Sequence, residues 1–164
     1  MRRMATMILL SAIPGSGKST WAREYQNAHP NTYIVASDEV RKRVSGSTQN
    51  FDHEALVWET FLNDINEHAG EDCTVIADAT NLQNRFRRYY YETTPGFDKH
   101  ILVVFDIPFE VCMKQNLMRA KERIVPEAGM IALHKEFEPP IQEVIDLYDE
   151  YYYIGADYKT VRVK

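Results

Sequence analysis

The feature that most constrains this chain is a glycine-rich turn between an apolar segment and a helical one. Residues 7–13 form an apolar run of strand length, and Pro-Gly-Ser-Gly follows at residues 14–17. Lys18 then opens a helical stretch that extends to about Ala28. Strand, loop and helix in this order are the context that a phosphate-binding loop requires, so we predict such a loop here. The alternative is a glycine-rich turn that only caps the helix.

The residue types in this loop suit the chemistry of a nucleoside triphosphate. Gly15 and Gly17 let the backbone turn its N–H groups inward around phosphates, and the N-terminus of the next helix adds partial positive charge. Lys18 can bridge the terminal phosphates of ATP, and the Ser19 hydroxyl can hold Mg²⁺. The pattern G-x-x-x-x-G-K-[ST] fails only at its first glycine, which is Ala12 here, where the chain leaves the strand. The expected ATP contacts in the loop are Gly15, Ser16, Gly17, Lys18, Ser19 and Thr20.

The rest of the chain repeats the alternation of apolar runs and amphipathic helices. Continuous apolar strands between such helices indicate a parallel sheet covered on both faces, which predicts an α/β fold. We expect one domain over residues 1–164, because neither a linker nor an internal repeat interrupts the pattern. The predicted strands are residues 7–13, 33–36, 74–77, 101–105 and 160–163, and the predicted helices lie near residues 18–28, 38–44, 52–70, 86–90, 108–118 and 141–148.

Asp38 follows the second apolar run, and Arg41 lies one helical turn further on. In open parallel sheets, ligands bind beyond the carboxyl ends of the strands, which is where Asp38 is expected. A carboxylate there can accept or orient the proton of a hydroxyl that attacks phosphate. We therefore predict that Asp38 and Arg41 contact the substrate. The alternative is that Ser37-Asp38 only caps the helix and Arg41 is a solvated charge.

Asp78-Ala79-Thr80-Asn81 ends the third predicted strand at the same edge of the sheet. This segment offers a carboxylate and two hydrogen-bonding side chains to magnesium-bound water, to an arginine or to the substrate. We predict that Asp78, Thr80 and Asn81 contact the substrate, with a simple turn and helix cap as the alternative.

Arg119 and Arg123 lie four residues apart where a helix gives way to a segment limited by Pro126. Side chains at this spacing share a helix face. The two arginines can close as a lid over ATP, which would supply cations to the transition state and exclude water. The alternative is an exposed basic stretch.

Other basic and aromatic groups are candidate contacts for a nucleic acid. The basic groups can form a surface that follows phosphates, or they can be solvated helix faces. Each tyrosine run would cover both faces of a helix, which favours partly buried aromatics over base-stacking platforms. The basic groups are residues 41–43 with Arg85, Arg87 and Arg88, and the tyrosine runs are residues 89–91 and 151–153.

The net charge of -5 means that any polyanion must be met by a local basic surface, which argues mildly against a nucleic-acid substrate.

Cys73 and Cys112 lack the spacing of a zinc site or a redox motif, so we expect reduced thiols in the core. The apolar run at residues 7–13 is too short for a signal peptide, and no stretch is long enough to span a bilayer. We expect no membrane association and a cytoplasmic location.

Four segments of the chain resemble the 5′-kinase domain of phage-type polynucleotide kinases, within the broader family of small P-loop kinases. In the family's order, they are residues 14–24 (PGSGKSTWARE), 38–41, 78–82 and 116–126. The first is the most specific, because the match continues through Trp21-Ala22-Arg23-Glu24 beyond the loop that such kinases share. The resemblance covers most of the chain and implies a P-loop NTPase fold of the adenylate-kinase-like type, a three-layer sandwich.

The resemblance also implies roles for particular residues. Lys18 and Ser19 would contact ATP and magnesium, Asp38 would be the general base, Arg41 would contact the acceptor phosphate, and Arg119 would be the catalytic arginine of the lid. Asp78 matches a further carboxylate of the site. The chain departs from the family pattern at Ala79, which is inserted before Thr80-Asn81 relative to one common form. It also ends without the phosphatase domain of some members, so we expect no 3′-phosphatase activity.

These observations favour an ATP-dependent polynucleotide 5′-hydroxyl kinase with Mg²⁺ as cofactor and the 5′ end of a nucleic acid as partner. The main alternative is a P-loop kinase for a small molecule such as a nucleoside, nucleotide or sugar. The other alternative is a nucleotide-dependent switch that phosphorylates nothing. The chain has no guanine-specific Asn-Lys-x-Asp motif, and a switch has no use for a basic lid facing an acceptor-side aspartate.

Overall fold

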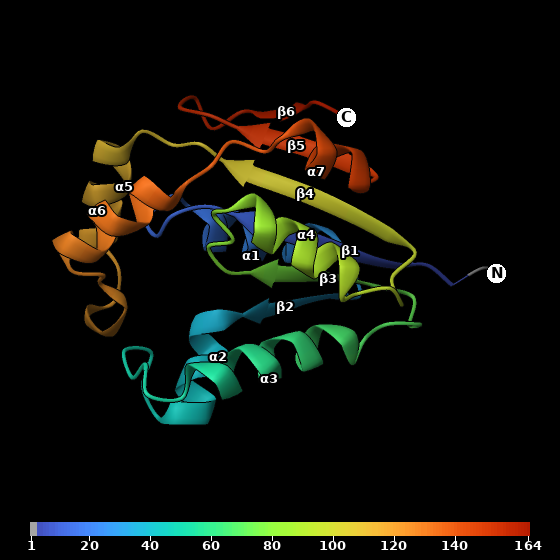
Figure 1. Ribbon diagram of the computed structural model, residues 1–164, viewed down its shortest axis with the longest axis horizontal. Helices are drawn as coiled ribbons and strands as arrows, with labels where there is room; N and C mark the ends of the chain where they lie inside the picture. Colours follow the sequence, from blue (N-terminus) through green and yellow to red (C-terminus); the bar gives the residue numbers. More distant parts are fainter. Residues whose placement is uncertain (1–2) are drawn as a thin grey trace.

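Six strands form one twisted sheet in the computed structural model of the protein, which describes residues 3–164 (Figure 1). The strand order is β2-β3-β1-β4-β5-β6, in which the first five strands are parallel and β6 is antiparallel to β5. The predicted α/β fold with a mainly parallel sheet is confirmed. The strands are β1 Ala5–Ser11, β2 Thr32–Ala36, β3 Cys73–Asp78, β4 Lys99–Phe105, β5 Glu150–Ile154 and β6 Thr160–Arg162.

Helices cover both faces of this sheet (Figure 1). One hydrophobic cluster joins the β1 side chains of Met7 and Leu9 to α3, α4 and α7, while the other joins Ile8 and Leu10 to α1, α5 and α6. Successive strand residues point to opposite faces, which is why a continuous apolar strand feeds both layers. The helices are α1 Lys18–Ala28, α2 Ser37–Ser45, α3 Glu54–Asn66, α4 Asn84–Glu92, α5 Phe109–Leu117, α6 Glu127–Glu136 and α7 Gln142–Leu147, with a short 3₁₀ helix at Lys121–Arg123.

The C-terminal part of the chain differs from the sequence prediction. The tyrosine run 151–153 lies in β5, so its assignment to a helix is wrong. Helix α7 ends at Leu147, and the chain turns into an extended segment that pairs with β4 from Glu150 onward. Helix α6 was not predicted. Its buried residue Met130 fills the cluster beside α5, but polar residues interrupt its apolar pattern.

Helix α2 begins without a side-chain cap. Its N-cap is Ala36, and both Ser37 and Asp38 lie within the first helical turn. The interpretation of Ser37-Asp38 as a capping pair is therefore wrong. The Asp38 carboxylate is left for other contacts, while its charge still stabilises the positive end of the helix dipole.

Arg87 is fully buried, so its assignment to a basic surface is wrong. Its guanidinium donates to the Ser11 hydroxyl at 3.0 Å, to the Leu82 carbonyl at 3.1 Å and to the Asn84 side chain at 3.0 Å. Burial lowers the pKa of Arg87 to about 10, which leaves it charged at neutral pH. Arg87 therefore ties α4 to the end of β1 and to the segment after β3.

Cys73 and Cys112 are free and buried, as predicted. Burial raises the pKa of the Cys112 thiol to about 11, which keeps it protonated and unreactive. Among residues 3–164, no helix is long and apolar enough to cross a membrane.

Candidate active site

The predicted phosphate loop lies between β1 and α1, and its two glycines have left-handed backbone conformations. Gly15 has φ 81° and Gly17 has φ 93°. A Cβ atom on Gly15 would overlap the carbonyl oxygen of Cys112, so the loop passes too close to α5 for any side chain. Ala12, which replaces the first glycine of the motif, is fully buried and donates its N–H to the Thr80 carbonyl at 2.8 Å. Its methyl group is therefore accommodated at the exit of the strand.

Ser16 supports a ligand-binding role for the loop. Its hydroxyl is buried, and it is the only buried side-chain polar atom within residues 3–164 that lacks a hydrogen-bond partner. A buried hydroxyl without a partner is energetically costly. A phosphate oxygen in the loop would supply the missing partner.

Lys18 and Ser19 both face Asp78 at the end of β3. The Ser19 hydroxyl donates to the Asp78 carboxylate at 2.8 Å, and Lys18 Nζ lies 4.0 Å from the same carboxylate. The two charged side chains are only 11% and 7% exposed. The sequence offered Asp78 to the substrate, to an arginine or to magnesium-bound water, and the structure brings it next to the residues expected to hold ATP and metal.

The Ser19 and Asp78 oxygens suit Mg²⁺, which prefers hard oxygen ligands and keeps several waters and substrate phosphates in its shell. One or two protein ligands are enough for such a site. Such a magnesium site does not require a cluster of three His, Cys, Asp or Glu side chains. The described part of the chain contains no cluster of this kind.

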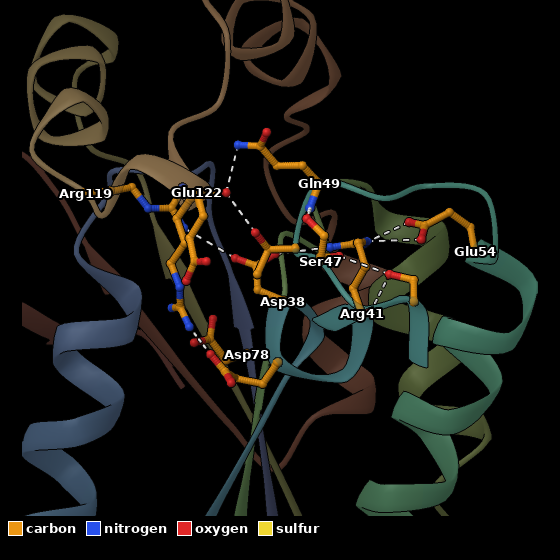
Figure 2. Close-up of polar contacts among 12 residues, drawn as sticks. Asp38, Arg41, Ser47, Gln49, Glu54, Asp78, Arg119 and Glu122 are labelled. Carbon is orange, nitrogen blue, oxygen red and sulfur yellow. Dashed lines mark hydrogen bonds and ion pairs between the residues drawn. The ribbon is translucent and has the colours of Figure 1, made fainter. Parts of the chain in front are cut away.

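Asp38 lies between two arginines from different parts of the chain (Figure 2). Arg41 Nη1 donates to one carboxylate oxygen at 3.1 Å, and Arg119 Nη2 donates to the other at 3.3 Å. The two guanidinium groups approach from opposite sides (Figure 2), and Asp78 lines the same cavity as Asp38. The predicted base and the predicted lid arginine are therefore in direct contact.

Arg41 is more buried than the sequence suggested. Its side chain is 6% exposed, and its guanidinium makes two hydrogen bonds to the Glu54 carboxylate of α3, at 3.0 and 2.7 Å. It also lies over the Phe51 ring, 4.6 Å from the centroid. Glu54 therefore offsets part of the positive charge of Arg41, and the guanidinium reaches the site through its hydrogen bond to Asp38.

Two adjoining cavities meet at the phosphate loop. The larger, of about 630 Å³, is called the active-site cavity here, and the smaller, of about 380 Å³, lies against the loop and Gln115 of α5. Both volumes are within the range of small-molecule sites. Lys18, Ser19, Arg119 and Arg123 line both cavities, whereas Asp38, Asp78 and Thr80 line the larger of these two but not the smaller.

Asn81 does not face the active-site cavity. Its backbone has φ 44°, its side-chain amide donates to the Leu10 carbonyl at 2.9 Å, and its own carbonyl accepts from Ser11 at 2.8 Å. These bonds fasten the segment after β3 to the end of β1. Of the Thr80-Asn81 pair, only Thr80 lines the active-site cavity.

The segment that carries the lid arginines is fastened to α2 and the loop after it, across the active-site cavity. Arg123 pairs with Glu39, and the Glu122 carbonyl accepts from Thr48 and Gln49, each at 2.7 Å. The Gln49 bond is visible in Figure 2. No sequence pattern indicates Thr48, Gln49 or Glu122, because these contacts join segments more than seventy residues apart.

A parallel sheet with a glycine-rich phosphate loop and a carboxylate beside its serine has the phosphate- and magnesium-binding parts of P-loop nucleotide-binding proteins, and a second carboxylate here faces an arginine of the lid segment. Comparison with known families agrees. Residues 7–140 match the family AAA_33, described as an AAA domain, and the chain therefore belongs to this family of P-loop kinases.

Three known proteins illustrate the similarity. An adenylate kinase from Pyrococcus furiosus is 27% identical over 150 residues, covering 81% of this chain, and the chain spans 64% of its length. The structure of Chaetomium thermophilum Kti12 in complex with ADP-AlF3 matches with TM-score 0.70 at 15% identity, over 92% of this chain and 89% of that one. A chain of the Pnkp1/Rnl/Hen1 RNA repair complex matches with TM-score 0.72 at 20% identity, over all of this chain and 50% of that one.

Proposed function

We propose that the protein is an ATP-dependent polynucleotide 5′-hydroxyl kinase, which transfers the γ-phosphate of ATP to the 5′-hydroxyl of DNA or RNA with Mg²⁺ as cofactor. The main support for this proposal is the position of Asp38. It lines the same cavity as Lys18, Ser19 and Asp78, and it is paired with Arg119. A carboxylate placed there can serve an acceptor hydroxyl, and a switch protein has no need of one.

In the proposed reaction, the loop N–H groups and Lys18 bind the β- and γ-phosphates. Ser19 and Asp78 would hold Mg²⁺, which would offset charge on the phosphate oxygens. Asp38 accepts the proton of the acceptor hydroxyl, whose oxygen forms a new bond to the γ-phosphorus as the bond to the ADP oxygen breaks. Arg119, with Arg123 beside it, stabilises the charge on the transferring group.

Two observations support a polynucleotide acceptor. The Asp38-x-x-Arg41 pair, which resembles the acceptor motif of polynucleotide kinases, is assembled as a hydrogen-bonded unit. The fold also matches a chain of an RNA repair complex over all of this chain and 50% of that one. A phosphate flanking the acceptor hydroxyl would lie near Arg41 when the hydroxyl is at Asp38. We place the reaction in the cytoplasm, in keeping with the two free cysteines.

A small-molecule kinase is the second candidate, and a specific observation favours it. Glu54 and Asp38 already engage the Arg41 guanidinium, and the chain carries a net charge of -5. Both features weaken the attraction for a polyanion. The similarity to an adenylate kinase points in the same direction.

Direct competition between acceptors decides between the candidates. Radiolabelled ATP is offered with a 5′-hydroxyl oligonucleotide, the matching nucleoside, its 3′-monophosphate, AMP and gluconate, and kcat/KM is measured for each. We expect the oligonucleotide and the nucleoside 3′-monophosphate to exceed the free nucleoside. If AMP, the free nucleoside or the sugar acid is the best acceptor, the small-molecule kinase replaces the polynucleotide kinase.

A further inference from the structure

A third cavity, of about 540 Å³, opens between α3 and α4 beside the active site. We call it the aromatic cavity. Thr80 lines both this cavity and the active-site cavity, so the two adjoin just beyond the end of β3. The aromatic cavity is lined by Trp58, Thr80, Asn81, Arg85, Phe86, Tyr89 and Tyr90.

Its walls present aromatic rings to solvent. Phe86 is 38% exposed and Tyr89 is 47% exposed, while Trp58 is half-buried across the cavity. Trp58 packs edge-on against Phe61 of the core, which holds its ring in place. Clustered exposed aromatic side chains are typical of binding sites, because leaving them in water is unfavourable.

The same wall carries a cation. The Arg85 guanidinium lies 4.5 Å from the centre of the Phe86 ring, and Nε donates to the Gln83 side chain at 2.7 Å. Within residues 3–164, the terminal nitrogens of Arg85 have no hydrogen-bond or ion-pair partner. The cavity thus joins flat aromatic faces to an available donor for anionic or carbonyl oxygens.

Trp58 links this cavity to the proposed acceptor site. The Arg41 guanidinium, which hydrogen-bonds to Asp38, lies 5.8 Å from the centre of the Trp58 ring. A hydroxyl at Asp38 is therefore one side chain away from the aromatic wall. A sugar that carries this hydroxyl could direct its base into the cavity.

We propose that the aromatic cavity binds the nucleobase of the nucleotide whose 5′-hydroxyl is phosphorylated. The base stacks on Phe86 and Tyr89, and Arg85 donates to oxygens on the polar edge of the base. This inference rests on the proposed function and makes it more specific. A nucleobase fits because it is flat, stacks on aromatic rings and has a polar edge for Thr80 and Arg85. A sugar acid has no aromatic face to stack on these rings.

The test compares acceptors that differ only in the base. Phe86→Ala and Tyr89→Ala are assayed with a 5′-hydroxyl oligonucleotide and with the same oligonucleotide carrying an abasic 5′-terminal residue. We expect each variant to lower kcat/KM about 5- to 150-fold for the complete acceptor, as loss of base stacking predicts. The abasic acceptor should be used equally by the variants and the wild type, and the KM for ATP should stay unchanged.

Tyr33→Ala is the matched control, because Tyr33 is 42% exposed and stacks on His68 outside the cavities described. It should behave as the wild type with both acceptors. Equal losses on the complete and abasic acceptors would assign Phe86 and Tyr89 a structural role and overturn the proposal. Unchanged kcat/KM for the complete acceptor in both variants would overturn it as well.

A binding measurement separates this inference from the proposed function. In a Trp21→Phe background, Trp58 is the only remaining tryptophan, and its fluorescence is followed during titration with a nucleoside 3′-monophosphate or with the abasic sugar phosphate. We expect the nucleoside 3′-monophosphate to change the emission and the abasic sugar phosphate to leave it unchanged. The nucleoside 3′-monophosphate should bind more weakly to the Phe86→Ala variant. This result would support the base site even if oligonucleotides prove not to be substrates. An identical response to both ligands would overturn the base site even if oligonucleotides are phosphorylated.

Discussion

At the scale of single residues, the site centres on charges that balance one another. Asp38 contacts Arg41 and Arg119, while Asp78 contacts Lys18 and Ser19. The sequence predicted all of these residues as site members, because each follows a strand or belongs to a motif. It could not predict how they pair, since pairing depends on which strands are neighbours.

Lys18→Ala should lower phosphate transfer by at least about 10²-fold, because the phosphates lose a positioned cation. Lys18 makes only a 4.0 Å ion pair with Asp78, so the fold should persist. The measurement is kcat/KM with the best acceptor, together with the circular dichroism spectrum. Near-normal turnover by the folded variant would disprove the role of the phosphate loop.

Arg119→Ala should lower kcat more than it raises the KM for ATP, because its charge is needed most in the transition state. Its pair with Asp38 is partly exposed, so stability should change little. Steady-state kinetics with varied ATP provide the measurement. A loss confined to ATP affinity would make Arg119 a ground-state binder instead.

Arg87→Leu should destabilise the protein by about 2–4 kcal/mol, because it leaves the buried Leu82 carbonyl and the Ser11 hydroxyl without their donor. Arg88→Leu is the control, since Arg88 makes only a surface ion pair with Glu143 at 3.9 Å. The free energy of unfolding in urea measures both. Similar losses in the two variants would show that the buried contacts of Arg87 contribute little.

At the scale of elements, the sequence predicted the strands and helices from β1 to α5, where apolar runs alternate regularly with amphipathic helices. After residue 126 the sequence also predicted α7 and β6, but it missed α6 and assigned the tyrosines of β5 to a helix. The three consecutive tyrosines of β5 have no periodicity that separates a helix from a strand, although tyrosine is enriched in strands, and pairing with β4 selects the strand. Helix α6 has few apolar residues on its buried face, so its periodicity is weak.

The close packing of the phosphate loop against α5 gives a prediction at this scale. Gly15→Ala should impair ATP binding and lower stability, because the new Cβ overlaps the Cys112 carbonyl. Gly46→Ala, at a similar φ of 89° but with no atom within 4 Å of a Cβ, should cost only about 1–2 kcal/mol of backbone strain. Calorimetric titration with ATP and urea unfolding test the pair. Equal behaviour of the two variants would contradict the steric argument.

At the scale of the whole molecule, two hydrophobic layers enclose one sheet, and a histidine lies within one of them. His100 of β4 is buried, with Nε2 2.9 Å from the Thr94 carbonyl and beside the rings of Tyr91 and Tyr148. Burial lowers the pKa of His100 below its usual value of 6.5, despite the opposing hydrogen bond to Thr94 and the charge of Asp149. The neutral form therefore predominates in the folded protein.

This histidine should make the protein less stable in mild acid. Because the unfolded chain binds a proton near pH 6.5 and the folded chain only at lower pH, stability should fall as the pH decreases from about 6.5 toward the folded-state pKa. His100→Gln should reduce this pH dependence. Urea unfolding between pH 7.5 and about 5 gives the measurement. An unaltered slope in His100→Gln would assign the acid sensitivity to other groups.

The strand order also has a consequence for synthesis on the ribosome. Strand β1 carries the phosphate loop, but its neighbours β3 and β4 are made much later, since Ala5 pairs with Cys73 and Thr6 with Lys99. At about 5–20 residues per second, the first of these partners follows roughly 3–14 s after β1. Throughout this interval the most apolar strand of the nascent chain has unpaired edges. The nucleotide-binding loop is thus translated well before the two strands that pair with β1.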